Sequence, residues 1–115
     1  MQTKALQNLV VKALEDLKGK NITVLDVTAL TAMTDAMIIC TGTSNRHVQS
    51  LAQNVVERAK KRKIQPLSIE GATEGEWVLV DLNSVIVHVM LPEAREFYSL
   101  EKLWSVREIH DDSRD

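Results

Sequence analysis

The stretch Thr34-Asp-Ala-Met-Ile-Ile-Cys-Thr-Gly-Thr-Ser-Asn-Arg-His-Val48 decides the fold of this chain. Its first half, Ala36 to Thr41, is a short apolar run of the kind that forms a buried strand. Its second half is a glycine turn followed by residues that commonly begin a helix. A junction of this kind directs backbone N–H groups out of the helix start, where phosphates and carboxylates are often bound. The stretch therefore predicts a buried strand, a following helix and a candidate anion site between them.

Length and composition place this stretch inside one small globular domain. The chain has 115 residues, of which 44% are hydrophobic, close to the average for globular proteins. Its formal net charge of -2 provides no overall field that would attract nucleic acid or an anionic membrane. The single cysteine, Cys40, fits a reducing compartment, and no window approaches the ~20 apolar residues that span a bilayer. We therefore expect a cytoplasmic protein without a membrane partner.

Hydrophobic periodicity assigns the elements on both sides of the opening stretch. Apolar residues recur at three- and four-residue steps over residues 6–17 and 48–59, which predicts two amphipathic helices. Gly19 ends the first helix, and either Thr43 or Ser44 caps the second. Runs rich in β-forming residues predict strands at 22–27, 36–41, 64–69, 77–82 and 85–90.

Two prolines and a polar segment mark the second half of the chain. Pro66 lies within the 64–69 run, and because proline cannot donate to a sheet ladder, this strand is expected at an edge. Residues 70–76 are polar and contain glycine, so a mobile loop is expected there. Pro92 suits the first turn of a last helix, which the apolar spacing extends to Trp104.

The runs at 77–82 and 85–90 are separated by Asn83-Ser84, the spacing of a two-residue hairpin, which fixes their register. One side of the hairpin then carries only aliphatic residues: Val78, Val80, Leu82, Val85, Val87 and Val89. The other side carries Trp77 opposite Met90 and Leu79 opposite His88. The aliphatic side is expected to face the core, and the mixed side to be only partly covered.

The predicted order of elements is αββαβββα, which belongs to the α/β class. Crossovers long enough for helices, combined with one tight hairpin, imply a mixed sheet with helices mainly on one face. No repeat or linker divides the chain, so residues 1–105 are expected to form a single domain. Residues 106–115 are polar and are expected to form a disordered C-terminal tail.

The turn Thr41-Gly-Thr-Ser44 occupies the position where nucleotidyltransferases hold a triphosphate. Those enzymes also need paired carboxylates that hold Mg²⁺ at the transferred phosphate. No predicted strand contains such a pair, and Glu74 and Glu76, which have the spacing, lie in the predicted mobile loop. We therefore expect no enzymatic activity, cofactor or metal; a nucleotidyltransferase-type enzyme is the competing hypothesis.

A basic run, Arg58 followed by Lys60 to Lys63, closes the second predicted helix. Cations there complement the negative end of the helix dipole, so a solvated helix end is the simplest interpretation. The alternative is an RNA-binding module that contacts phosphates. Because no aromatic residues interleave these charges, strong direct binding of nucleic acid is not expected.

Arg46 and His47 lie in the first turn of the same predicted helix, where positive charge opposes the dipole. Helix stability therefore does not account for them. Either they pair locally with Asp35 or Asp26, or they contact a partner.

The mixed side of the hairpin is the leading candidate for a partner-binding surface. Trp77 and Met90 on a half-covered sheet make good anchors for a protein partner. His88 lies beside them, with no Cys or second His at metal-ligand spacing. Two alternatives are that the last helix covers this side and that the protein forms a homodimer through it.

Four ordered motifs of this sequence resemble those of the ribosomal silencing factor (RsfS) family, also called the Iojap family. The motifs are Thr34–Val48, Trp77–Leu82, Val85–Met90 and Arg95–Trp104, and the similarity covers Lys4 to Trp104. The resemblance implies a nucleotidyltransferase-like fold without the catalytic carboxylates, in agreement with the missing pair. Where the family usually has Gly-Asp, this chain has Asn83-Ser84, a departure that concerns only the turn geometry.

The resemblance also implies a function. Family members bind the large ribosomal subunit through ribosomal protein fourteen, block its joining to the small subunit and lower translation when nutrients are short. The resemblance makes Trp77, His88, Tyr98, Leu100 and Leu103 candidate contacts, with Lys102 as a polar contact at the rim. Arg46 and His47 either support the fold or touch the partner. The resemblance, together with the hairpin face that includes Met90 and the missing carboxylate pair, predicts a translation repressor that is not an enzyme.

Overall fold

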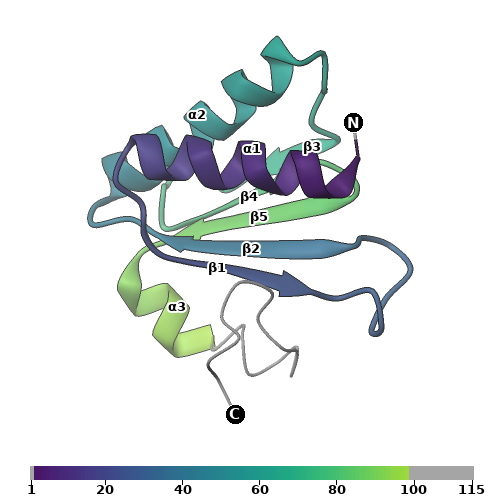
Figure 1. Cartoon of the computed structure of the whole chain (residues 1–115). Helices are drawn as coiled ribbons and strands as arrows, with labels where there is room; N and C mark the ends of the chain where they lie inside the picture. The colour runs from purple at the N-terminus through teal and green to yellow at the C-terminus, as the bar shows by residue number, and fades with distance from the viewer. Residues whose placement is uncertain (1, 99–115) are drawn as a thin grey trace.

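A computed structural model describes residues 2–98 of the chain, with side chains as far as Arg95. The elements are α1 (Thr3–Asp16), β1 (Lys20–Asp26), β2 (Ala36–Thr41), α2 (Asn45–Lys61), β3 (Ser68–Glu70), β4 (Trp77–Asp81), β5 (Val85–Met90) and α3 (Pro92–Tyr98). They form a five-stranded mixed sheet in the order β1-β2-β5-β4-β3. Figure 1 shows α1 and α2 together on one face and the short α3 on the other. The predicted order of elements and the predicted placement of the helices are confirmed.

The sheet is centred on β2 and β5, which run parallel to each other, while all other neighbours are antiparallel. Every residue of β2 is buried, as its continuous apolar run predicts. The register predicted for the β4–β5 hairpin is also confirmed, with Val78 opposite Val89 and Val80 opposite Val87. Asn83 in the two-residue turn has a φ of 77°, a conformation that Asn tolerates better than most residues.

Two hydrophobic clusters lie on opposite faces of the sheet. The larger one joins α1 and α2 to the sheet and contains all six aliphatic residues of the hairpin, which confirms that this side faces the core. The smaller one, on the α3 face, consists of Leu25, Val27, Met37, Ile39 and Met90, with Trp77 and Ala94 packed against it. One face of the sheet therefore supplies most of the core.

The edge strand β3 is shorter than the sequence predicts and begins later, at Ser68. Pro66 lies before it, because a residue without an N–H group cannot extend the ladder with β4. The edge position of this strand is confirmed. Leu67 and Ile69 leave 67% and 45% of their surfaces exposed there.

The loop of residues 71–76 is anchored to α2, although its polar sequence predicts mobility. The Asn45 side chain donates to the carbonyl of Glu74 at 2.9 Å, and Gln49 donates to the carbonyls of Ala72 and Thr73, also at 2.9 Å. At Gly71 the φ is 81°, and a Cβ would lie 2.1 Å from the carbonyl oxygen of Trp77. Only glycine fits that position.

The predicted continuation of the last helix to Trp104 and the predicted tail at 106–115 lie outside the described residues. Within residues 2–98, no helix has the length and apolar character required to cross a membrane.

Candidate functional site

The turn between β2 and α2 already uses backbone N–H groups that an anion would need. Ser44 is the N-cap, and its hydroxyl accepts from the His47 N–H at 3.0 Å. The Thr43 N–H donates to Nδ1 of His47 at 2.9 Å, and the Gly42 N–H donates to the Met90 carbonyl at 2.9 Å. Because these three donors have internal partners, the turn is arranged as scaffold, unlike the open N–H cradle of a phosphate site.

Close packing accounts for the glycine in this turn. A Cβ at Gly42 would lie 2.6 Å from Cγ2 of Val48 and 3.0 Å from its backbone nitrogen. Gly42 thus lets β2 approach the first turn of α2. No group of three or more His, Cys, Asp or Glu side chains within residues 2–98 is placed to hold a metal ion.

His47 ties the ends of the two long helices together. Its Nδ1 accepts from the Thr43 N–H, so Nε2 carries the proton and donates to the Leu17 carbonyl at 2.8 Å. The predicted ion pairs with Asp35 and Asp26 are not formed; Asp35 instead accepts from the Thr3 hydroxyl at 2.9 Å. His47 therefore supports the fold by bonding to a carbonyl 30 positions away in the sequence. A local sequence pattern could not reveal this contact.

Arg46, in contrast, is exposed and has no hydrogen-bond or ion-pair partner among the described residues. It borders a shallow hollow of about 450 Å³ with Leu17 and Gln49. The fold therefore explains His47 and leaves the charge of Arg46 available to a partner.

The side chains of Trp77 and His88 form a polar pair on the α3 face of the sheet. The indole Nε1 of Trp77 donates to Nδ1 of His88 at 2.9 Å, and the ring centroids lie 5.8 Å apart. His88 is 6% exposed, and this burial lowers its pKa from 6.5 to about 4. A neutral His88 therefore holds the half-buried Trp77 in one orientation.

The prediction that Trp77, His88 and Met90 form an open surface together is wrong for two of the three. Met90 has no exposed surface and His88 is buried. Met90 lies in the smaller cluster, against which Ala94 of α3 packs, so the last helix covers it. The accessible part of this face lies towards β4, where Trp77, Leu79, Asp81 and Ile86 are half-buried.

Arg95 fastens α3 to the sheet, a role that sequence reasoning missed. One guanidinium nitrogen donates to the Asn21 carbonyl at 2.6 Å and to the Thr41 hydroxyl at 3.0 Å, and the other donates to the Thr23 hydroxyl at 2.9 Å. These acceptors converge where the register of β1 shifts between Lys20 and Thr23. An irregularity of this kind leaves a carbonyl unpaired in the ladder, which an arginine can satisfy.

The remaining predicted contacts fall at or beyond the end of the described structure. Tyr98 is the last residue of α3, and nothing is described of its side chain. Leu100, Lys102 and Leu103 lie outside the described residues.

Comparison with known proteins identifies the family. A sequence model of the family described as "Ribosomal silencing factor during starvation" matches residues 1–115. The chain belongs to this family. It is 45% identical to a ribosomal silencing factor of Chromobacterium violaceum over 104 residues, which cover 90% of this chain and 85% of that protein.

A solved structure and a protein named for a mitochondrial role are also similar to this chain. The fold matches the crystal structure of a Chromobacterium violaceum protein with a TM-score of 0.90 at 44% identity, covering 93% of this chain and 89% of that one. A mouse protein named for mitochondrial assembly of the ribosomal large subunit is 36% identical, over 90% of this chain and 47% of its own length. Relatives of this chain are thus named for regulatory and assembly roles.

Proposed function

We propose that this protein binds the large ribosomal subunit through ribosomal protein fourteen and prevents that subunit from joining the small one. Translation then falls when nutrients are short, and the protein acts in the cytoplasm. The observation that carries the proposal is the family match over residues 1–115. The name of the mouse relative, which refers to the large subunit, supports the choice of partner.

The proposed contact surface is the open part of the α3 face, and we call it the Trp77 surface. It consists of Trp77, Leu79, Asp81 and Ile86, which the two long helices do not cover. The hydrogen bond to His88 fixes Trp77 before binding, so Trp77 loses little side-chain entropy when a partner binds. An aromatic anchor of this kind is a typical hot spot.

We assign the other predicted contacts according to their surroundings. Tyr98, Leu100, Lys102 and Leu103 are proposed contacts on the strength of the family resemblance. His88 and Met90 are proposed to support the Trp77 surface from beneath, because both are buried. Arg46 lies at the start of α2, and its exposed charge makes it a proposed second contact.

The arrangement of the β2–α2 turn supports a regulatory role over nucleotidyl transfer. Three of its N–H groups bond to Ser44, His47 and Met90, and the close approach of Val48 leaves room only for glycine at position 42. Incubation with nucleoside triphosphates and Mg²⁺ is expected to give no turnover. Turnover that disappears in a Glu74→Gln/Glu76→Gln variant would instead support the enzyme hypothesis.

Co-sedimentation with purified large subunits tests the proposed surface. Replacement of Trp77 by Ala should weaken binding by ~1–4 kcal/mol, which is about fivefold to several hundredfold in Kd. Trp77→Phe keeps one aromatic ring but loses the donor to His88 and part of the apolar surface, so its loss of affinity should be smaller. Circular dichroism must show that both variants remain folded.

The matched control is Met33→Ala, since Met33 is 84% exposed in the loop between β1 and β2, far along the sheet from Trp77. This variant should bind as the wild type does. Undiminished co-sedimentation of Trp77→Ala would remove the Trp77 surface from the proposal. Light scattering of mixed subunits tests the second step: binding that leaves subunit joining unchanged would refute the proposed block.

A further inference from the structure

The outer surfaces of α1 and α2 enclose a second hollow, on the opposite side of the sheet from Trp77. It has a volume of about 550 Å³. Lys12 comes from α1 and Arg58, Lys61 and Arg62 from the end of α2, with Leu9 between them. No acidic side chain lines this hollow, which we call the basic groove. Figure 1 shows the two helices lying together above the sheet.

The charges of the basic groove are only partly neutralised. Asp16 forms an ion pair with Arg58 and lies 4.0 Å from Lys12. Lys61 and Arg62 are exposed and have no ion pair among the described residues. Four cations thus face one carboxylate, in a protein whose formal net charge is -2. This part of the surface therefore carries a local excess of positive charge.

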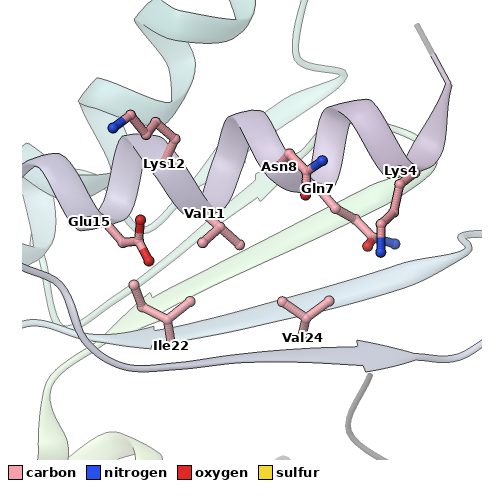
Figure 2. A pocket seen from close by; sticks show the side chains of 8 residues that line it. All are labelled: Lys4, Gln7, Asn8, Val11, Lys12, Glu15, Ile22 and Val24. Atoms are coloured by element: carbon pink, nitrogen blue, oxygen red, sulfur yellow. The ribbon is translucent and has the colours of Figure 1, made fainter. Parts of the chain in front are cut away.

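The helix dipole explains only some of these cations. Basic residues in the last turn of α2 complement its negative end. Lys12 lies in the middle of α1, where no such effect operates, and it adds charge to the same hollow from a second element. Figure 2 shows that Lys12 also lines the neighbouring hollow over β1, which Val11, Ile22 and Val24 border.

The chemistry of the groove favours a phosphodiester backbone as its occupant. The side chains that line it are cationic, amide or aliphatic, and none is aromatic, so it offers no platform for stacking an unpaired base. A double-helical RNA presents phosphates and 2′-hydroxyl groups on its outside. Lys and Arg bind phosphates, and Asn8, which also lines the hollow, carries an amide whose donors and acceptor suit either group.

We propose that the basic groove contacts the phosphate backbone of a ribosomal RNA helix while the Trp77 surface holds a ribosomal protein. This inference rests on the proposed function, because a large subunit presents both partners. The RNA contact is weak and independent of sequence. Its role is to raise the affinity and fix the orientation of a protein bound at two places.

Binding of a labelled RNA duplex of about 16 base pairs, followed by fluorescence anisotropy, tests the groove directly. The full chain should bind with a Kd on the order of 10⁻⁴ to 10⁻⁶ M at physiological salt. The variant Lys61→Glu/Arg62→Glu should bind at least about tenfold more weakly, and the dependence of log K on log salt should become shallower by about two. The control Lys18→Glu/Lys20→Glu makes the same change in net charge at exposed sites outside the groove and should bind as the wild type does.

Three results of this experiment would overturn the proposal: no binding of the duplex by the wild type, equal losses in the two variants, or displacement of RNA by polyglutamate at equal charge. The last result would point to an acidic protein as the occupant.

A second measurement separates the groove from the Trp77 surface. The Lys61→Glu/Arg62→Glu variant should lose affinity for large subunits and keep its affinity for isolated ribosomal protein fourteen. Equal binding of the variant and the wild type to large subunits would refute the groove as a ribosomal contact. If the wild type bound neither large subunits nor isolated ribosomal protein fourteen, the proposed function would fail. The duplex experiment would still decide whether the groove binds RNA.

Discussion

Burial of His88 makes the stability of the protein depend on pH, and the sign of the dependence follows from the structure. Its pKa is lowered from 6.5 to about 4 in the folded protein because the buried imidazolium loses its hydration. Between these two values the unfolded chain binds a proton that the folded protein does not. The contribution of neutral His88 to the free energy of unfolding is therefore complete above about pH 6.5 and is lost as the pH falls toward about 4. Integration of the proton uptake gives a loss of roughly 2 kcal/mol between about pH 7 and about pH 5.

The assay is urea unfolding of the wild type and of His88→Asn across this pH range, followed by far-UV circular dichroism. Asn retains an acceptor for the indole N–H of Trp77 and cannot take up a proton. The other titrating groups are shared by both proteins, so their contributions cancel in the difference of unfolding free energy. The stability advantage of the wild type over the variant should shrink by roughly 2 kcal/mol between about pH 7 and about pH 5. Parallel pH profiles would refute the assignment of His88 as buried and neutral.

Three further predictions concern other buried contacts. Cys40 has no exposed surface, and burial raises its pKa to about 11, so a disulfide exchange reagent should modify it at least ~100-fold faster in urea than in the folded protein; equal rates would contradict its burial. Gly42→Ala should lower the unfolding free energy in urea by ~1–3 kcal/mol because its Cβ would overlap Val48; an unchanged midpoint would contradict the close packing. Arg95→Lys should cost about 1–3 kcal/mol and speed hydrogen exchange in α3, because Lys cannot reproduce the fork to Thr23 and Thr41; unchanged exchange would remove Arg95 as the tie.

Features that depend on neighbouring residues could be predicted from the sequence. The bounds of β2 follow from its continuous apolar run, the hairpin register from the two-residue turn, and the edge position of β3 from Pro66. The sequence also contains a pattern that indicates how the loop of residues 71–76 is anchored. Asn45 and Gln49 are four positions apart, so they lie on one side of α2, and both bond to that loop.

Features that depend on distant residues could not be predicted in this way. His47 bonds to Leu17, 30 positions earlier, and Arg95 bonds to Thr23, 72 positions earlier. Burial of Met90 under Ala94 requires knowing on which face α3 lies. Hydrophobic periodicity identifies the apolar side of an element without identifying what covers it, and for that reason an open surface was expected at Met90.

The unequal cover of the two sheet faces explains where a binding surface can exist. On one face, α1 and α2 bury a continuous apolar cluster. On the other, the five-residue cluster around Met90 is closed by a short helix that depends on Arg95 and three polar acceptors at β1 and β2. Trp77 packs against the same cluster as Ala94 of α3, and its orientation is also fixed by a contact that does not depend on α3. The hydrogen bond to His88 is such a contact, because both residues belong to the β4–β5 hairpin.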